Sequence, residues 1–401
     1  LLVGLDPSTA LFTAGIGTLI FHLVTKGKVP IFLGSSFAFV APIIKATELY
    51  GLPGTMSGLV AVGTVYGLMS LLVRWRGIGF IKRLFPPVVI GPVIILIGLS
   101  LAGSGVNMAK ENWPLALVAL LSAILASMLG RGMLRLIPIF CGIIVGYLTA
   151  SLFGLIDFKP VIEAPWFAFP QFVKPSLSWE AVIFMIPVTI APVIEHIGDV
   201  YAINEVTGKD FVKDPGLHRT LIGDGLATSL SALVGGPANT TYGENTGVLE
   251  LSKVHDPKVI RIAALYAVIL SFIPKMAEVI GSMPSAIIGG VSFMLYGMIS
   301  AIGVRNVVEN HVDFTKSRNL IIAGVIFVCG LGFSNGLTFT VSGTDITLTS
   351  LAIAAIAGIL LNAILPGNDY HFGKDVEADS NRGIDMMPNL HEDTSYGDHE
   401  E

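Results

Sequence analysis

Residues 235–247 read GGPANTTYGENTG, and this stretch decides the fold. It occupies a position where a membrane-spanning helix would be expected, yet it opens on two glycines and a proline. A second stretch, PIFLGSSFAF at residues 30–39, has the same character. Extended backbone carries N–H and C=O groups that lipid cannot satisfy, so such segments must pair with protein or line a cavity. The sequence therefore predicts two broken helices within a membrane protein.

The two broken segments are expected to pair with each other as short antiparallel strands. Helical character resumes after each break, at about Phe37 and Glu244. The helices that follow would direct the positive ends of their dipoles at one place near the middle of the membrane. That place suits a polar, planar or partly anionic ligand. The competing interpretation is a pair of re-entrant loops that serve only packing.

The composition is that of a membrane protein. Of the 401 residues, 53% are hydrophobic and 13% are charged, whereas soluble domains carry roughly 25% charged residues. The apolar residues come in blocks of about 20, which is enough for a helix to cross the bilayer. Cys141 and Cys329 both lie inside such blocks, so a disulfide framework is not expected.

Thirteen apolar spans are expected in the chain. They lie near residues 9–25, 31–47, 54–73, 84–102, 113–130, 135–154, 180–200, 219–235, 240–252, 260–279, 285–303, 319–333 and 348–366. The chain begins inside another apolar stretch and without a methionine, which suggests that most of a preceding helix is missing. With that helix the count becomes fourteen.

The positive charges predict an orientation. Connections on the side that holds Lys26 carry seventeen Lys and Arg residues, against five on the other side. Because cytoplasmic loops are enriched in these residues, we expect the Lys26 side to be cytoplasmic. The tail from Asp369 to Glu401 contains ten acidic and two basic residues. It is expected to be a disordered, solvated cytoplasmic segment.

An internal repeat relates the two halves of the chain. Residues Pro86, Ile90, Gly91, Val93, Gly105 and Val106 recur at an offset of 198 as Pro284, Ile288, Gly289, Val291, Gly303 and Val304. The first copy begins on the predicted cytoplasmic side and the second on the outer side. Related halves of opposite polarity are typical of inverted-repeat transporters. The expected fold class is therefore an all-α polytopic membrane protein with a 7+7 inverted repeat and two half-helices preceded by short antiparallel strands.

Intramembrane carboxylates are the strongest candidates for function, because such charges are costly in lipid. Glu195 and Asp199 are separated by four residues and share one helix face, while Glu244 opens the helix after the second break. If the three converge, they surround one cavity, where a carboxyl group could exchange a proton. The alternative is a structural role, which is more plausible for Asp199 because it lies closer to the cytoplasmic end.

Other polar residues in the spans are interpreted as structural. His196 points to a different face from Glu195 and is expected to form packing or interhelix hydrogen bonds rather than a proton relay. His22 is interpreted in the same way, and residues 213–219 (KDPGLHR) as a charged helix cap. No metal-ligand cluster, nucleotide-binding loop or nucleophile–base pair is apparent. We therefore expect no catalytic residues, no metal and no cofactor.

Four motifs carry a resemblance to a known family. These motifs resemble the nucleobase–ascorbate transporter family, and most closely its bacterial uracil permeases; they are LGSSFAF (33–39), AxxxEHIGD (191–199), KDPGLHR (213–219) and NTTYGENTGV (239–248). Ser252 stands where the family signature usually has Thr. A histidine usually follows the first Glu by four residues in the uracil carriers, whereas this chain has Asp199.

The resemblance implies a division into core and gate domains. Residues 1–78 and 177–280 would form the core domain, residues 79–176 and 281–367 the gate domain, and residues 368–401 the acidic tail. It implies a homodimer through the gate domains in the cell inner membrane, with the lipid bilayer as surroundings and no nucleic-acid partner.

The resemblance also implies the ligand and its site. Uracil and H+ would be the partners of a proton-coupled symporter that works by alternating access. The substrate-binding residues would be Glu195, Glu244, Phe37, Gly243, Tyr242 and Ser36, with proton coupling at Glu195 and Asp199. Carriers of xanthine, urate or thymine remain alternatives, as does an anion exchanger or channel on the same architecture. A membrane-embedded enzyme or receptor is the remotest alternative.

Overall fold

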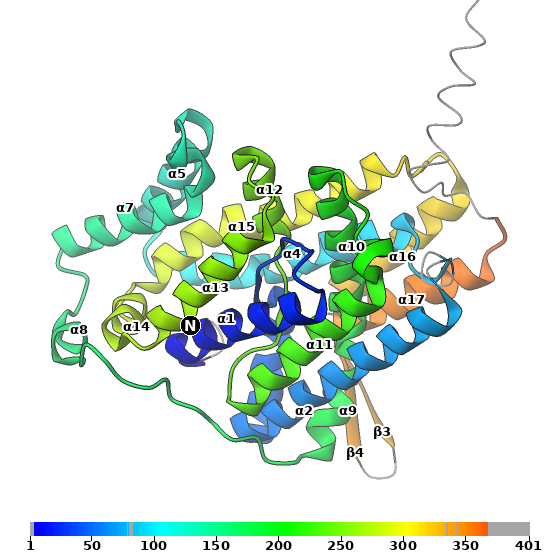
Figure 1. The fold of residues 1–401 in the computed structure, drawn as a ribbon, viewed down its shortest axis with the longest axis horizontal. Coiled ribbons are helices and arrows are strands. Elements are labelled where there is room, and N and C mark those ends of the chain that lie inside the picture. The colour runs from blue at the N-terminus through cyan, green and yellow to red at the C-terminus, as the bar shows by residue number, and fades with distance from the viewer. Residues whose placement is uncertain (1–3, 78, 80–82, 334–335, 342–343, 368–401) are drawn as a thin grey trace, which may run out of the picture.

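The computed structural model describes residues 4–77, 79, 83–333, 336–341 and 344–367. The main helices, in chain order, are α1 (Pro7–Val24), α2 (Val40–Arg76), α4 (Pro87–Ala109), α5 (Trp113–Leu129), α6 (Met133–Leu136), α7 (Pro138–Leu152), α8 (Lys159–Glu163), α9 (Trp179–Val188), α10 (Ile190–Thr207), α11 (Leu217–Leu233), α12 (Gly243–Ser252), α13 (Pro257–Ser271), α14 (Pro274–Gly281), α15 (Ser285–Glu309), α16 (Ser317–Gly332) and α17 (Ser350–Ile364). The expected acidic tail, residues 368–401, lies outside the described residues. Figure 1 shows the arrangement of the helices.

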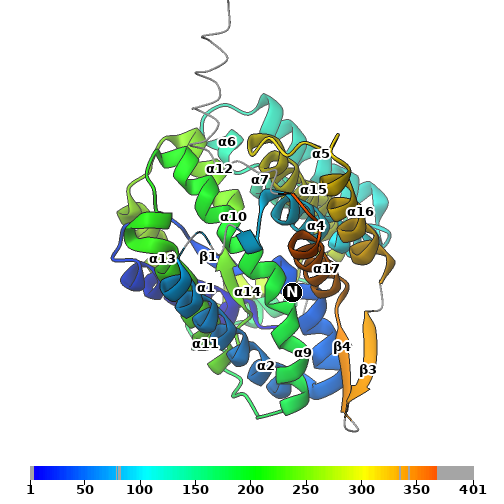
Figure 2. The same cartoon turned by 90° about the vertical axis from the view of Figure 1, so that its right-hand side faces the viewer.

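The two broken segments pair as expected. Strand β1 (Leu33–Ser35) runs antiparallel to β2 (Asn239–Thr241), and Gly34 lies opposite Thr240. Figure 2 shows this pair inside the bundle. Helical structure resumes with a 3₁₀ helix at Phe37–Phe39 after β1 and with α12 after β2. This geometry confirms the prediction of two half-helices preceded by short antiparallel strands.

Polar side chains of neighbouring helices satisfy the outer edges of the strand pair. Thr18 of α1 accepts a hydrogen bond from the backbone N–H of Leu33 at 2.9 Å. Thr228 of α11 donates to the carbonyl oxygen of Asn239 at 2.6 Å. These contacts supply the partners that lipid could not provide. Each strand thus receives a hydrogen-bond partner from the helix that immediately precedes it in the chain.

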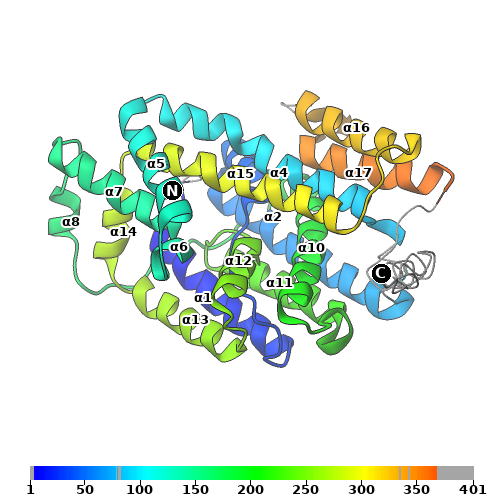
Figure 3. The same cartoon turned by 90° about the horizontal axis from the view of Figure 1, so that it is seen from above.

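The two halves of the chain pack reciprocally. Helix α1 packs on α13, and in the same way α11 packs on α2. Likewise, α5 packs on α15, and α16 packs on α4. Helices α4 and α15, which carry the sequence repeat, make the most extensive helix contact with each other. Figure 3 shows α4, α15, α16 and α17 lying to one side of α1, α11 and α13. Such exchange of partners between equivalent helices is the packing of an inverted repeat.

Glycines make the contact between α4 and α15 close. A Cβ atom on Gly303 would lie 2.7 Å from the carbonyl oxygen of Gly91, and one on Gly289 would lie 2.9 Å from that of Gly105. The repeat offset equates Gly91 with Gly289 and Gly105 with Gly303. The contact between Gly91 and Gly303 and the contact between Gly105 and Gly289 are therefore equivalent under the repeat, as in a two-fold symmetric interface.

Several helices are long and apolar enough to cross a membrane. Among the described residues five qualify singly, and a bent pair, α13 with α14 at 85°, makes six. Four further apolar helices, α5, α7, α16 and α17, are shorter. The predicted boundary between residues 47 and 54 coincides with a backbone break in α2 at Gly51, where φ is 70°. The hairpin of β3 (Leu337–Val341) and β4 (Thr344–Leu348) was not predicted.

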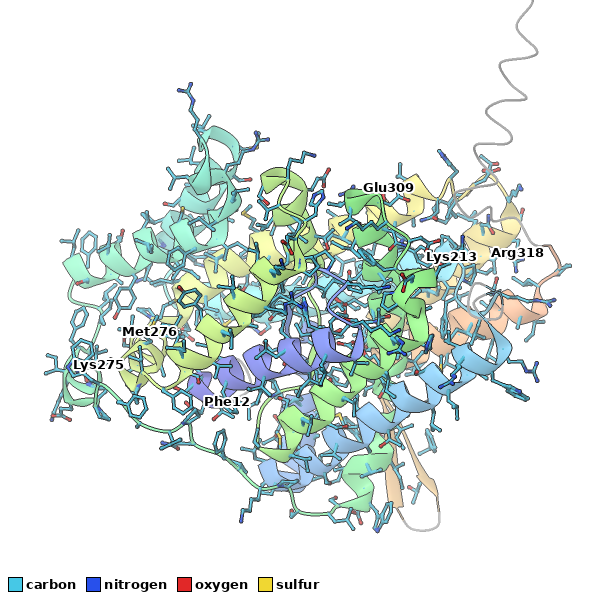
Figure 4. All side chains as sticks on the ribbon, viewed as in Figure 1. Phe12, Lys213, Lys275, Met276, Glu309 and Arg318 are labelled. Atoms are coloured by element: carbon cyan, nitrogen blue, oxygen red, sulfur yellow. The ribbon has the colours of Figure 1, made fainter. Side chains whose placement is uncertain are left out.

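Charged residues are separated along the long axis of the molecule. Figure 4 places Lys213, Glu309 and Arg318 towards one end and Lys275 towards the other. The Nζ atom of Lys275 donates to the carbonyl oxygens of Val161 and Ile162 at 2.8 and 3.0 Å. In the sequence, Lys213 and Arg318 belong to connections on the side that holds Lys26, and Lys275 belongs to a connection on the opposite side. Their separation agrees with that division.

The contact between α2 and α11 gives a matched pair of glycine substitutions. A Cβ atom on Gly63 would lie 2.3 Å from the carbonyl oxygen of Gly225, whereas one on Gly67, a turn later in α2, meets nothing within 4 Å. We expect Gly63→Ala to lower the unfolding free energy by about 1–3 kcal/mol, because the helices must separate. Thermal unfolding in detergent measures this. Equal melting temperatures for Gly63→Ala and Gly67→Ala would contradict the expectation.

Candidate functional site

Asp199 of α10 lies against the second break. Its Oδ2 atom accepts a hydrogen bond from Thr241 Oγ1 at 2.7 Å, and its side chain is buried. A Cβ atom on Gly243 would lie 2.8 Å from Asp199 Oδ1. The absence of a side chain at Gly243 therefore allows the first turn of α12 to approach this carboxylate closely. The structure brings Asp199 and Gly243 together, although the sequence left a structural role open for Asp199.

Glu195 lies one turn before Asp199 on the same face of α10. It is half-buried, and α10 contacts both β2 and α12. Glu244 lies in the first turn of α12 by its backbone, while its side chain is outside the described part of the structure. The face of α10 that carries Glu195 and Asp199 is thus turned to the second break.

Tyr242 ties the two breaks together. Its hydroxyl group donates to the carbonyl oxygen of Ser35 at 3.2 Å. A Cβ atom on Gly34 would lie 2.3 Å from Cζ of Tyr242, so the ring lies directly on the Gly34 backbone. Any side chain at Gly34 would displace this ring. Tyr242 therefore links the start of α12 to strand β1.

Residues after the first break face α15. Ser36 is buried, and its Oγ atom has no hydrogen-bond partner among the described residues. The Phe37 ring meets the ring of Tyr296 edge-on, with centroids 6.0 Å apart. Tyr296 also lines a cavity of about 160 Å³ between α4 and α15. Sequence reasoning did not single out Tyr296, since an isolated tyrosine in an apolar span carries no distinguishing signal.

A buried histidine–aspartate pair lies beside the site. His196 Nδ1 is 3.2 Å from Asp224 Oδ2, and both side chains are fully buried. His196 Nε2 lies 3.0 Å from Thr220 Oγ1, whose own hydrogen is directed to the carbonyl oxygen of Leu217. Nε2 must therefore donate to Thr220. Nδ1 faces Asp224 Oδ2 in a close polar contact that falls outside hydrogen-bond geometry.

The pair connects three elements around the second break. His196 belongs to α10 and Asp224 to α11, while Thr240 of β2 donates to Asp224 Oδ2 at 3.4 Å. The Tyr66 ring of α2 meets the His196 ring edge-on at 6.3 Å. Sequence reasoning anticipated an interhelix role for His196 but missed Asp224. The rule that an intramembrane carboxylate is functional applied to Asp224 as well as to Glu195.

Two glycines of α12 provide a test of the close approach to Asp199. We expect Gly243→Ala to weaken substrate binding by about tenfold or more, because its methyl group must displace either Asp199 or the first turn of α12. Gly247→Ala is the control, since a Cβ atom there meets nothing within 4 Å. Substrate affinity of the two purified variants, measured by equilibrium binding, checks this. Unchanged affinity for Gly243→Ala would show that the contact is not needed.

The fold and the site together define a class of protein. Two half-helices that meet through paired strands at the centre of an inverted repeat, with carboxylates on the adjacent helix, are the arrangement of a multi-pass membrane transporter. The fold resembles the transmembrane domain of a cyanobacterium bicarbonate transporter, BicA, with a TM-score of 0.52 at 15% identity, covering 76% of this chain and 92% of that one. It also resembles SLC26A9, with a TM-score of 0.56 at 12% identity, covering 90% and 64%.

Comparison of sequences gives the family. The model Xan_ur_permease, described as Permease family, matches residues 2–339, and this chain belongs to that family. A uracil permease of Bacillus caldolyticus is 46% identical, covering 91% of this chain and 87% of the relative. A uracil permease of Bacillus subtilis is 44% identical, covering 91% and 88%. The family resemblance is thereby confirmed, and the chain is a permease rather than an enzyme.

Proposed function

We propose that this permease imports uracil together with a proton across the cell inner membrane. The observation that carries the proposal is the carboxylate-bearing face of α10, with Glu195 and Asp199, set against the paired strands and α12. The names of the similar permeases support uracil as the substrate. Asp199, in place of the usual histidine, is part of the proposal because of its contact with Thr241.

The chemistry of the ring fits such a site. Uracil presents two N–H donors and two carbonyl acceptors around a flat ring, so it needs both acceptors and donors from the protein. Glu195 and Glu244 would accept from or donate to the ring edge, depending on protonation. Peptide groups at the starts of the half-helices, around Ser36, Phe37 and Gly243, would supply the remaining hydrogen bonds. The Phe37 and Tyr242 rings would border the bound base.

Transport would proceed by movement of two groups of helices against each other. The core domain, residues 1–78 and 177–280, would carry the strand pair and both half-helices. The gate domain, residues 79–176 and 281–367, would remain fixed, and two gate domains would form the homodimer. Proton binding at Glu195, assisted by Asp199, would accompany uracil binding. The side that holds Lys26 would be cytoplasmic, and so would the tail.

Uptake of labelled uracil into proteoliposomes tests the function. We expect accumulation when the outside is more acidic, and little accumulation without a pH gradient. Unlabelled uracil should compete, while xanthine, urate and thymine should compete more weakly. Preferential competition by one of those bases would reassign the substrate, and uptake that ignores the pH gradient would remove the proton from the proposal. Exchange of small anions without uracil transport would favour the anion-exchanger alternative.

A further inference from the structure

A cationic cavity lies between the end of α1 and the first turns of α13, away from the candidate substrate site. Its volume is about 290 Å³, and it is lined by Leu19, His22, Leu23, Lys26, Gly27 and Arg261. Helices α1 and α13 pack along each other, as Figures 1 and 3 both show. The cavity lies at the end of α1 that the charge pattern assigns to the cytoplasmic side.

Two cations of this cavity have no counter-ion among the described residues. Neither Lys26 nor Arg261 makes an ion pair or a side-chain hydrogen bond with any residue that the structure describes. Neighbouring cations differ, since Lys28 pairs with Asp214 and Arg219 donates to the carbonyl oxygen of Val24. The positive charge of the cavity is therefore available to an anion, and a guanidinium group is well suited to phosphate oxygens.

The backbone of the turn at Lys26 and Gly27 packs closely against Arg261. Lys26 and Gly27 both adopt left-handed conformations, with φ of 59° and 64°. A Cβ atom on Gly27 would lie 2.5 Å from Arg261 Nη1. The guanidinium group thus lies on the bare Gly27 backbone, which only glycine permits. This contact holds the charge of Arg261 next to that of Lys26.

His22 adds an unsatisfied buried atom to the cavity wall. Its side chain is 2% exposed, and Nε2 lies 3.0 Å from the carbonyl oxygen of Ile31. Since a carbonyl only accepts, Nε2 carries a proton and donates. Nδ1 is buried and has no partner among the described residues. With Nε2 protonated, Nδ1 is an acceptor and calls for a donor such as water or a ligand hydroxyl group, because buried polar groups are normally hydrogen-bonded.

The surroundings of the cavity identify the kind of ligand. Leu23 is 81% exposed, and Ile262 and Leu265 of α13 are exposed as well. In a membrane protein such a surface faces acyl chains, so an occupant would combine an anionic head with apolar tails. Basic pockets between helices near the cytoplasmic leaflet bind anionic lipid headgroups. We propose that this cavity binds the phosphodiester headgroup of an anionic phospholipid, held by Lys26 and Arg261.

Native mass spectrometry of the full chain tests the lipid site. Detergent-solubilised protein would be titrated with phosphatidylglycerol, with phosphatidylcholine, and with inorganic phosphate. We expect phosphatidylglycerol to bind and the double variant Lys26→Gln/Arg261→Gln to bind it about thirtyfold more weakly, since each basic residue near an anionic surface contributes roughly fivefold. The matched control is Lys209→Gln/Lys258→Gln, which removes two exposed cations that do not line the cavity and should leave binding unchanged.

The alternative outcomes are distinct. Equal binding of phosphatidylcholine, or equal weakening in the control variant, would overturn the proposal. Binding of inorganic phosphate at millimolar concentration, without binding of phosphatidylglycerol, would assign the cavity to a free anion instead of a lipid. If the double variant does not fold, Lys26→Gln alone is used, because Lys26 is exposed. It should bind phosphatidylglycerol roughly fivefold more weakly, and an unchanged affinity would again overturn the proposal.

Discussion

Glu195→Gln is expected to reduce proton-driven uracil uptake by about tenfold to a hundredfold. The substitution keeps the size of the side chain but removes the charge and the capacity to exchange a proton. Hydrogen bonds to charged groups contribute about 1.5–3 kcal/mol, which corresponds to this range. The measurement is initial uptake of labelled uracil into proteoliposomes at several external pH values. The remaining transport should no longer respond to the pH gradient.

The matched control for this experiment lies on the same helix. Glu205→Gln changes an exposed carboxylate of α10, away from the strand pair, and should transport uracil at the original rate. Both variants should reconstitute with similar yield. Full, pH-dependent uptake by Glu195→Gln would remove Glu195 from the coupling mechanism while leaving the family assignment intact.

Asp224→Ala is expected to lower the unfolding free energy by about 1–3 kcal/mol, the usual cost of leaving a buried polar group without its partner. It would leave His196 opposite an apolar group, while Thr240 would lose its acceptor. Reversible unfolding in mixed detergent micelles measures the free energy. The double variant His196→Ala/Asp224→Ala should lose less than the two single variants added together, because their effects are coupled.

An exposed ion pair supplies the comparison for Asp224. Asp210 and Lys213 are 3.2 Å apart at the surface, and Asp210→Ala should change stability by no more than about 1 kcal/mol. Additive effects of the His196 and Asp224 substitutions would mean that the two residues act independently, in spite of their proximity.

The hydrogen-bonding needs of the backbone in a membrane made the centre of the fold predictable from sequence. Glycine, proline and small hydroxyl residues at 30–39 and 235–247 are incompatible with continuous lipid-facing helices, so pairing of the two segments could be inferred. The offset of 198 identified α4 and α15 as equivalent helices of an inverted repeat. These inferences succeed because they rest on local chain properties and on symmetry.

Contacts between side chains that lie far apart in the sequence were harder to predict. Nothing in the sequence places the Tyr242 ring on Gly34, because that contact depends on the register of β1 against β2. The pairing of His196 with Asp224 depends on how α10 and α11 are rotated about their axes. The β3–β4 hairpin was missed for another reason, since two five-residue strands between apolar spans give only a short and weak sequence pattern.

The strand pair at the centre is built from peptide groups, and this has an evolutionary consequence. A frame held by N–H and C=O groups places few demands on the side chains of the strands themselves, provided that the close-packed glycines and the hydroxyl groups of Thr18 and Thr228 that bond its edges are kept. Such a frame can be inherited while the chemistry of the cargo diverges. The likeness in fold to the transmembrane domain of a bicarbonate transporter at 15% identity shows that similar frames form from very different sequences. Differences in selectivity would then lie in a handful of positions on helices such as α10, with the scaffold unchanged.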